Sequence, residues 1–285
     1  MKKAEKKENI KDHCRLPGSD YFFCRTLSGN FGFVRTAGAY PEMKQFLYSP
    51  DSFLDKGRIL KNSRSTRAAI VEIDHRQYFL KRYNNKGLIY SLKYLFRQSR
   101  PFNVWNSSLL IRKLGIPCPE VIAALSHRRF GILTASYLLT ESIDGNIQPE
   151  DYIRESAVKP DIYVKFQSRM CAYLKKMHDA GIRHGDLKLN NIYCRKDSDG
   201  LEFGLYDFDG TDVFRKPLSQ EMRIKEYARI ISSWIIISNR IGVPVDRERI
   251  ISGFSKKYCE SNGIEMNVPL LNQLTDAFLN RKRKY

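Results

Sequence analysis

The sequence lacks any cysteine pattern that builds a covalent or metal-bound framework. Its six cysteines are spaced irregularly, and no two of them form a CxxC pair. Disulfide-stapled secreted domains and zinc modules depend on regular spacing, so the sequence speaks against both classes. Free cysteines fit the reducing cytoplasm, which is the location we expect.

Long apolar runs are also missing. One of the longest, YARIISSWIIIS (227–238), falls well short of the roughly 20 residues that cross a bilayer. We interpret it as a buried helix. The first residues, MKKAEKKENIKDH, are almost all charged or polar and resemble neither a signal peptide nor a membrane span. We expect residues 1–50 to form an N-terminal extension whose start is disordered.

Acidic residues are scarce relative to basic ones. The chain has 31 Asp and Glu against 49 Lys and Arg, which gives a net charge of +18. Such a charge attracts polyanions: nucleic acids, anionic lipid surfaces or phosphorylated substrates. Charge alone does not choose among them. Because the sequence shows no zinc-finger, RNP-like or helix-turn-helix signal, no specific nucleic-acid partner is expected.

Hydrophobic periodicity divides the chain into a strand-rich first half and a helix-rich second half. Alternating apolar and polar residues predict a hairpin over 68–83 and further strands at 120–125 and 131–142. Helical spacing of apolar residues predicts helices at 104–114, 164–181, 219–240 and 268–281. This order of elements predicts two lobes with a cleft between them.

Two polar clusters interrupt the second half. His184-Gly185-Asp186 follows a predicted helix, with Asn191 five residues after Asp186, and Asp207 opens a second acidic turn after a short strand. Phosphoryl transfer needs a carboxylate that accepts the hydroxyl proton, oxygen ligands for magnesium and a cation on the ATP phosphates. Asp186 is the candidate base, Asn191 and Asp207 the candidate metal ligands, and Lys81 the candidate cation. The alternative is that these are ordinary loop and strand-edge residues.

These motifs carry a resemblance to a known superfamily. HGDLKLNN (184–191) resembles the H-x-D-x-x-x-x-N catalytic loop of protein-kinase-like enzymes, and YDFDG (206–210) resembles their metal-binding turn. The lysine of FLK (79–81) precedes both motifs in the correct order. Over roughly residues 55–240 the chain most resembles the bacterial lipopolysaccharide core kinases that act on Kdo or heptose.

The resemblance implies an α+β, two-lobed protein-kinase-like fold. A small antiparallel-sheet lobe with one main helix, residues 51–140, would bind ATP. A larger and mostly helical lobe, residues 141–285, would carry the catalytic loop and bind the acceptor. The implied function is ATP- and Mg²⁺-dependent transfer of phosphate to a sugar hydroxyl of the lipopolysaccharide core or of a lipid A-linked sugar. The implied location is the cytoplasmic face of the bacterial inner membrane, where the enzyme would bind peripherally.

The resemblance also assigns secondary roles. Lys188 would contact the transferred phosphate, although a solvent-facing lysine is the equal alternative, and His184 would hold the loop together. No G-x-G-x-x-G precedes the lysine strand, so Ser63, Ser65 and Thr66, or backbone amides there, would cover the ATP phosphates. By order along the chain, the linker with Glu141, Ser142 and Ile143 would lie beside the adenine.

Two features leave alternatives open. No acidic residue lies between Lys81 and Glu120, so the helix glutamate that usually pairs with the lysine is absent, and Asn103 or Asn106 would have to substitute. This motivates rival functions: a kinase of another small molecule or of protein, or a catalytically silent module that binds anionic glycolipid or nucleic acid. The basic amphipathic segment 84–100 could lie on an anionic membrane or pack on the small lobe.

Overall fold

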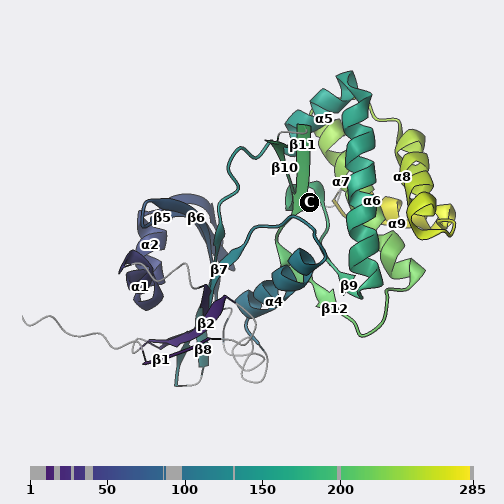
Figure 1. Cartoon of the computed structure of the whole chain (residues 1–285). Helices are drawn as coiled ribbons and strands as arrows, with labels where there is room; N and C mark the ends of the chain where they lie inside the picture. Colours follow the sequence, from purple (N-terminus) through teal and green to yellow (C-terminus); the bar gives the residue numbers. More distant parts are fainter. Residues whose placement is uncertain are drawn as a thin grey trace, which may run out of the picture. The chain divides into compact units, whose positions relative to one another are not determined.

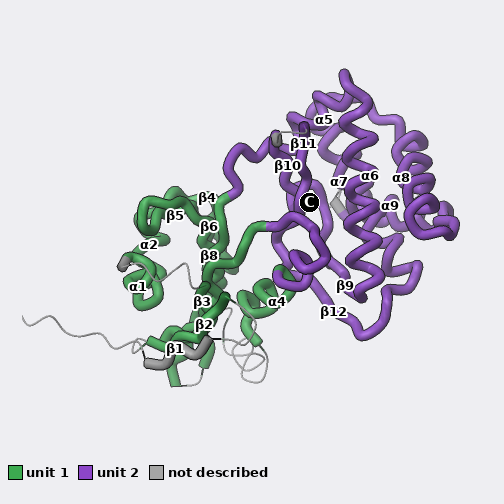
Figure 2. Tube along the Cα trace, in the orientation of Figure 1, with its two compact units in different colours: residues 1–108, 119–142 green, residues 109–118, 143–285 purple. Residues whose placement is uncertain are grey.

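The computed structural model describes residues 11–15, 20–26, 29–35, 41–85, 87, 98–130, 132–197 and 200–282. Figure 1 shows the chain coloured along its sequence, and Figure 2 colours its two compact units separately. Unit 1 comprises Met1–Ser108 and Pro119–Ser142, and unit 2 comprises Leu109–Cys118 and Ile143–Tyr285.

Unit 1 is built on an eight-stranded sheet with the order β1-β2-β3-β7-β8-β6-β5-β4. Every neighbouring pair is antiparallel. The strands are β1 (Lys11–Arg15), β2 (Tyr21–Arg25), β3 (Asn30–Arg35), β4 (Arg58–Asn62), β5 (Thr66–Ile73), β6 (Arg76–Asn84), β7 (Val121–Arg129) and β8 (Ile132–Glu141). The predicted hairpin and both further strands are therefore confirmed.

The β5–β6 hairpin has a tight turn without glycine. Asp74 and His75 both have positive φ, +49° and +61°, the geometry that matches the twist of two-residue hairpins. Glu42 at the start of α1 secures the turn: its carboxylate accepts the backbone N–H of Asp74 at 2.5 Å, and its own N–H donates to the Asp74 carboxylate at 3.3 Å. The turn fixes the register of β6, which carries Lys81.

Among the described residues, the helices that accompany the sheet are α1 (Pro41–Tyr48), α2 (Pro50–Lys56) and α4 (Arg100–Lys113). Residues of α1 and α2, such as Phe46 and Leu54, join the buried core with strand residues such as Leu80 and Leu139. The start of α4 packs through Trp105, whose ring stacks 4.3 Å from that of Phe33 on β3. The last residues of α4 belong to unit 2.

Unit 2 is mainly helical. Its long helices are α5 (Pro149–Val158), α6 (Pro160–Asp179), α7 (Gln220–Arg240), α8 (Arg247–Asn262) and α9 (Val268–Lys282). Helix α6 packs against α5 and α8, and α7 packs against α9 (Figure 1). A buried aromatic cluster joins these helices to the hairpin of β10 (Ile192–Asp197) and β11 (Gly200–Leu205); it comprises Tyr152, Phe166, Phe203, Trp234 and Phe254.

The structure differs from the expectations in two respects, and one further expectation falls mostly outside the described residues. Residues 1–50 were set apart as an extension, yet their described part contributes β1, β2, β3 and α1 to unit 1. Helices α5 and α8 were not predicted. Most of the basic segment 84–100, including residues 88–97, lies outside the described residues. Within the described part of the chain, no helix has the length and apolarity needed to cross a membrane.

Candidate active site

The His184-Gly185-Asp186 turn follows α6 and the short strand β9 (Ile182–Arg183). Strand β9 pairs antiparallel with β12 (Asp212–Val213), which brings this turn beside the short helix η3 (Phe208–Gly210). Gly185 has a φ of +83°, and a Cβ there would come within 2.0 Å of the Gly210 carbonyl oxygen. Only glycine fits this close approach of the two backbones.

Glu226 of α7 holds the turn by its backbone. One carboxylate oxygen accepts the N–H of His184 and the other accepts the N–H of Gly185, both at 2.8 Å. Glu226 is buried, and His178 Nε2 lies 3.7 Å from its carboxylate. Burial acts to raise the pKa of Glu226, but the interactions with His178, His184 and the backbone together bring the pKa below its ordinary value. The turn is thereby tied to α7 through an anionic carboxylate.

His184 is fully buried and acts as a structural residue. Its Nε2 lies 3.2 Å from the Tyr206 carbonyl oxygen, and its ring centroid is 5.3 Å from that of Phe208. Burial lowers the pKa of His184, outweighing the opposing influence of Glu226 and Asp207. A neutral imidazole therefore links the two turns, in agreement with the loop-holding role expected for it.

Three hydrogen-bond donors converge on the Asp186 carboxylate. Lys188 Nζ lies 2.9 Å from Oδ2, and Arg229 Nη1 of α7 lies 3.0 Å from Oδ1. The Asn191 amide nitrogen is 3.4 Å from Oδ2. The side chain of Asp186 is 43% exposed, so an acceptor hydroxyl has access to it. The structure thus brings together the predicted base, the predicted phosphate-contacting lysine and one predicted metal ligand.

The two predicted metal ligands lie on adjoining backbone segments. The Tyr206 N–H donates to the Asn191 carbonyl at 3.1 Å, immediately before Asp207. Asp207 adopts the left-handed conformation with φ +63°, a strained geometry that clusters at functional sites. The Asn191 side-chain nitrogen donates to the Asp186 carbonyl at 2.8 Å, so this bond commits the amide nitrogen and leaves the amide oxygen for another role.

This donor set fits magnesium. Mg²⁺ takes one or two protein oxygens and fills its remaining positions with water and substrate phosphate, and Asn191 and Asp207 supply an amide and a carboxylate oxygen. Among the residues that the structure describes, no group of three His, Cys, Asp or Glu side chains could hold a metal by itself.

Lys81 lies in unit 1, on the central strand β6. It pairs with Ala68 of β5 and Leu138 of β8. Its Nζ lies 5.2 Å from the centroid of the Tyr83 ring, and the Arg100 guanidinium at the start of α4 lies 4.7 Å from the same ring. Helix α4 thus brings a second cation against the ring that Lys81 contacts. Asn106 donates to Gln98 at 3.3 Å.

Ser63, Ser65 and Thr66 form the turn between β4 and β5. The Ser63 hydroxyl donates to the Thr66 carbonyl at 2.9 Å and accepts the Thr66 N–H at 3.2 Å. The Ser65 carbonyl accepts the backbone N–H of Asn84 at 3.0 Å, next to the end of β6. The Ser63 hydroxyl and the backbone N–H groups of Ser63 and Thr66 are therefore engaged within the turn. The Ser65 hydroxyl lies 3.5 Å from the Ser63 hydroxyl.

Glu141 ends β8 and is braced by the residue before β7. Its N–H donates to the Glu120 carbonyl at 2.9 Å, and its carboxylate accepts the Glu120 N–H at 3.0 Å. Ile143 is the first residue of the second part of unit 2. The predicted residues thus fall into two groups: Lys81, Ser63, Ser65, Thr66 and Glu141 in unit 1, and Ile143, Asp186, Lys188, Asn191 and Asp207 in unit 2.

Sequence reasoning missed two residues of the site, Glu226 and Arg229. Both lie on α7, within a stretch whose other members are largely buried and apolar. Two charged residues within an apolar stretch could have indicated these roles, because charged side chains are rarely buried without a partner. Their partners, Gly185 and Asp186, lie more than 40 residues earlier in the chain.

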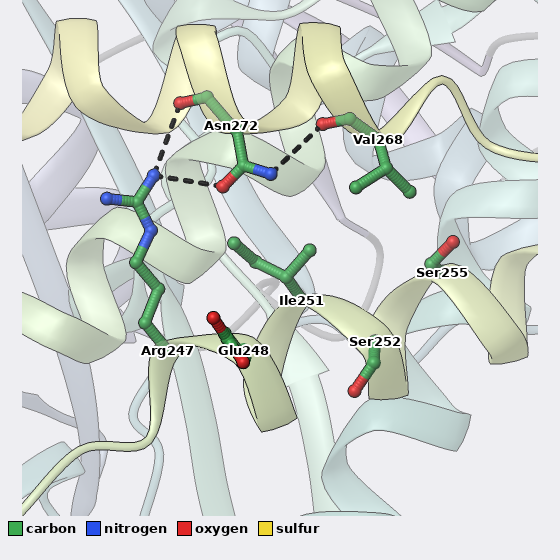
Figure 3. Close-up of a pocket in the computed structure, with 7 residues that line it drawn as sticks. All are labelled: Arg247, Glu248, Ile251, Ser252, Ser255, Val268 and Asn272. Carbon is green, nitrogen blue, oxygen red and sulfur yellow. Dashed lines mark hydrogen bonds between the residues drawn. The ribbon is translucent and has the colours of Figure 1, made fainter.

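A separate cavity of about 490 Å³ opens between α8 and α9 (Figure 3). Arg247 lies on one side and donates to Asn272 at 3.1 Å and to Asp276 at 2.7 Å. Ile251 and Val268 give the cavity apolar walls. None of the predicted site residues lines it.

Comparisons with known proteins agree with this description. The model of the Lipopolysaccharide kinase (Kdo/WaaP) family matches residues 45–235, more than half of the 285-residue chain. The chain is 28% identical to the lipopolysaccharide core heptose(I) kinase WaaP of Escherichia coli (strain K12) over 137 residues, which make up 46% of this chain and 52% of that protein. It is 25% identical to the 3-deoxy-D-manno-octulosonic acid kinase of Vibrio cholerae serotype O1 over 168 residues, 56% of this chain and 68% of that protein.

The match thus spans about half the length of the Escherichia coli relative. Among solved structures, WaaP in complex with acyl carrier protein superposes with a TM-score of 0.59 at 16% identity, covering 81% of this chain and 92% of that chain. This likeness confirms the predicted kinase-like fold of an antiparallel-sheet part and a helical part. The predicted resemblance is also confirmed: the chain belongs to the Lipopolysaccharide kinase (Kdo/WaaP) family.

Proposed function

We propose that the protein is an ATP-dependent kinase that transfers the γ-phosphate to a sugar hydroxyl of the lipopolysaccharide core, on Kdo or heptose. Family membership supports the reaction class, and two relatives of known activity phosphorylate these two sugars according to their names. One structural observation carries the proposal: an accessible Asp186 carboxylate lies in contact with Lys188 and Asn191 on a loop anchored by Glu226.

In the proposed reaction, the acceptor hydroxyl approaches Asp186. The acceptor oxygen forms a bond to the γ-phosphorus, the bond from that phosphorus to the ADP oxygen breaks, and the hydroxyl proton passes to the Asp186 carboxylate. Lys188 stabilises the negative charge of the transferred group. Asn191 and Asp207 would hold Mg²⁺, which neutralises phosphate charge when bound.

We assign ATP binding to the residues of unit 1. Lys81 would contact the phosphates, with Ser65 and the backbone amides of the 63–66 turn covering them. The segment from Glu141 to Ile143 would recognise adenine through backbone groups. This assignment follows the expected division into an ATP-binding part at 51–140 and a catalytic, acceptor-binding part at 141–285. Loss of ATP affinity in Lys81→Ala, measured by calorimetry, tests it.

We further propose that the protein works at the cytoplasmic face of the bacterial inner membrane. The net charge of +18 favours association with anionic lipid and with a polyanionic glycolipid acceptor. Sedimentation with phosphatidylglycerol vesicles should show binding that weakens as salt increases. Binding that is equally weak to neutral and anionic vesicles would contradict a membrane location.

The decisive experiment supplies both substrates. Purified protein is incubated with Mg²⁺, γ-labelled ATP and dephosphorylated lipopolysaccharide, and mass spectrometry locates the label. Label on a Kdo or heptose residue supports the proposal and identifies the acceptor. ATP binding without label on any core sugar would point to another acceptor, and a failure to bind ATP would favour a silent kinase-like module, the alternative motivated by the missing helix glutamate.

A further inference from the structure

Arg229 reaches the reacting carboxylate from outside the catalytic loop. It lies on α7 one turn after Glu226, and its Nη1 lies 3.0 Å from Asp186 Oδ1. Lys188 occupies the other carboxylate oxygen at 2.9 Å. The three side chains are part-exposed: 28% for Arg229, 39% for Lys188 and 43% for Asp186. Solvent, and therefore a ligand, can reach Asp186 and the two cationic side chains that contact it.

The guanidinium of Arg229 also contacts α9. Its central carbon lies 4.8 Å from the centroid of the Phe278 ring, and Arg281 lies 5.8 Å from the same ring. An aromatic face beneath a guanidinium attracts it and restricts its orientation. Phe278 thus limits the directions in which the N–H groups of Arg229 point. Helix α9 lies beyond residues 45–235, which the family model matches.

The hydrogen-bonding capacity of Arg229 exceeds what the described protein uses. A guanidinium carries five N–H donors in a fixed plane and accepts no proton. Within the described residues, its recorded hydrogen bond is the one from Nη1 to Asp186. The Asp186 carboxylate thus has two cationic partners, Lys188 and Arg229. An anionic group beside the acceptor hydroxyl would occupy the remaining donors of Arg229.

We propose that Arg229 selects the acceptor by binding a carboxylate or phosphate that neighbours the hydroxyl to be phosphorylated. The inference rests on the proposed function and names the chemistry that this site recognises. With one edge on Asp186 and another on the acceptor anion, the planar guanidinium bridges base and substrate. It sets the distance from the hydroxyl to Asp186, while Lys188 stays available to the transferred phosphate. Arg229 is therefore a specificity residue, and Phe278 is a positioning residue that acts through it.

The test compares three acceptors. The first is phosphatase-treated core glycolipid that retains its carboxylates and its lipid A phosphates. The second is the same material with its carboxylates reduced to alcohols, and the third is fully dephosphorylated with hydrogen fluoride but keeps its carboxylates. We measure kcat/KM for wild type, Arg229→Gln and Arg240→Gln. Arg240 is the matched control because it lies at the end of the same helix and pairs with Glu150 instead.

Wild type and Arg240→Gln should lose about tenfold or more in kcat/KM when the recognised anion is removed, as expected for a charged hydrogen bond. Arg229→Gln should already be slower by about that factor on the first acceptor and should no longer distinguish the acceptors. The acceptor on which wild type loses activity shows whether a carboxylate or a phosphate is bound. If Arg229→Gln kept the wild-type ratios among the three acceptors, the inference would be wrong and Arg229 would only orient Asp186.

Two controls keep the result interpretable. Phe278→Leu leaves both charges in place and should weaken discrimination partially, which covers the case that Arg229→Gln fails to fold. If wild type labels none of the acceptors, the proposed function fails and the inference fails with it. If wild type labels the first acceptor, the proposed function stands. The ratios of kcat/KM among the three acceptors then test only the role of Arg229.

Discussion

At the scale of single residues, the site depends on a glycine that permits two loops to touch. Gly185 combines a φ of +83° with a backbone separation too small for a Cβ. Its neighbours on either side, His184 and Asp186, depend on this approach. His184 contacts the turn that contains Tyr206 and Phe208, and Asp186 is the proposed base. The glycine therefore positions the base without touching a substrate.

Gly185→Ala should destabilise the protein more than Gly242→Ala. Both glycines have positive φ, +83° and +71°, so each substitution incurs about 1–2 kcal/mol of backbone strain. Only at position 185 does the added Cβ also meet a carbonyl oxygen, at 2.0 Å, whereas nothing lies within 4 Å of it at position 242. Urea unfolding of the two variants measures the difference. Equal losses of unfolding free energy would contradict the close approach of the two loops.

Sequence reasoning selected residues that the structure brings together. Asp186, Asn191 and Asp207 were singled out because phosphoryl transfer needs a base and oxygen ligands for magnesium, and Lys188 was singled out by resemblance. The structure brings Asp186, Lys188 and Asn191 into contact, and their roles stay predictions. Arg229 was not found, because its role arises only when α7 packs beside the loop. A contact over 43 residues leaves no local signature.

At the scale of elements, α7 is the support of the site. Besides Glu226 and Arg229, its Ser233 hydroxyl accepts the N–H of Leu189 at 3.0 Å. Helix α7 begins with a Ser219 side chain that accepts the N–H of Met222 at 3.4 Å, and its buried apolar face fixes it in unit 2. The loop of residues 184–191, which has little regular structure of its own, is held by these contacts with α7.

Glu226→Gln tests this dependence on α7. The substitution keeps the size of the side chain but removes the charge that accepts two backbone N–H groups. We expect a loss of about 1–3 kcal/mol in unfolding free energy, with slower phosphate transfer. Glu221→Gln, in the exposed first turn of the same helix, is the control and should behave as wild type. If Glu226→Gln had the stability and the transfer rate of wild type, Glu226 would not be the residue that anchors the loop.

The buried histidines predict a dependence of stability on pH. Burial lowers the pKa of His178 and of His184 below the ordinary value of 6.5. Below pH 6.5 the unfolded chain therefore binds protons that the folded chain does not, so stability is full above pH 6.5 and falls as the pH decreases. The pKa of Glu226 is also lowered, from 4.5, so its contribution is lost only at still lower pH.

Thermal unfolding between pH 4 and 8 measures this effect. His184→Gln should flatten the slope below pH 6.5, whereas His75→Gln should not, because the His75 side chain is 98% exposed. A wild-type Tm that stays constant from pH 7 to pH 5 would mean that the histidines titrate equally in both states.

Elements with a clear hydrophobic period were predicted well. The β5–β6 hairpin alternates and α6 repeats its apolar residues at helical spacing, and both appear near their predicted bounds. The strands β1, β2 and β3 were missed because the charged and polar first residues led us to set residues 1–50 apart as an extension. Helix α8 was missed because its apolar positions are few and separated by lysines and serines.

At the scale of the whole molecule, the sequence predicted two parts with different compositions, residues 51–140 and 141–285, and this division stays a prediction. The two compact units of the structure are each made of two separate stretches of the chain, because Leu109–Cys118 belongs to unit 2. The spacing of apolar residues predicts such a division, because strands and helices bury apolar residues at different spacings. The order of strands in the sheet could not be predicted in this way, because β3 pairs with β7, which is distant in sequence. The kinase-like character came from motifs whose chemistry constrains their spacing.

The central claim, that Asp186 is the base of a kinase reaction, is tested most directly by phosphate transfer from γ-labelled ATP to dephosphorylated lipopolysaccharide in wild type, Asp186→Asn and Asp144→Asn. Asp144 is an exposed loop residue of the same unit. The account predicts that Asp186→Asn lowers the transfer rate by a factor of about 100 or more while ATP binding and Tm are preserved, and that Asp144→Asn matches wild type. Transfer by Asp186→Asn at the wild-type rate would contradict the account.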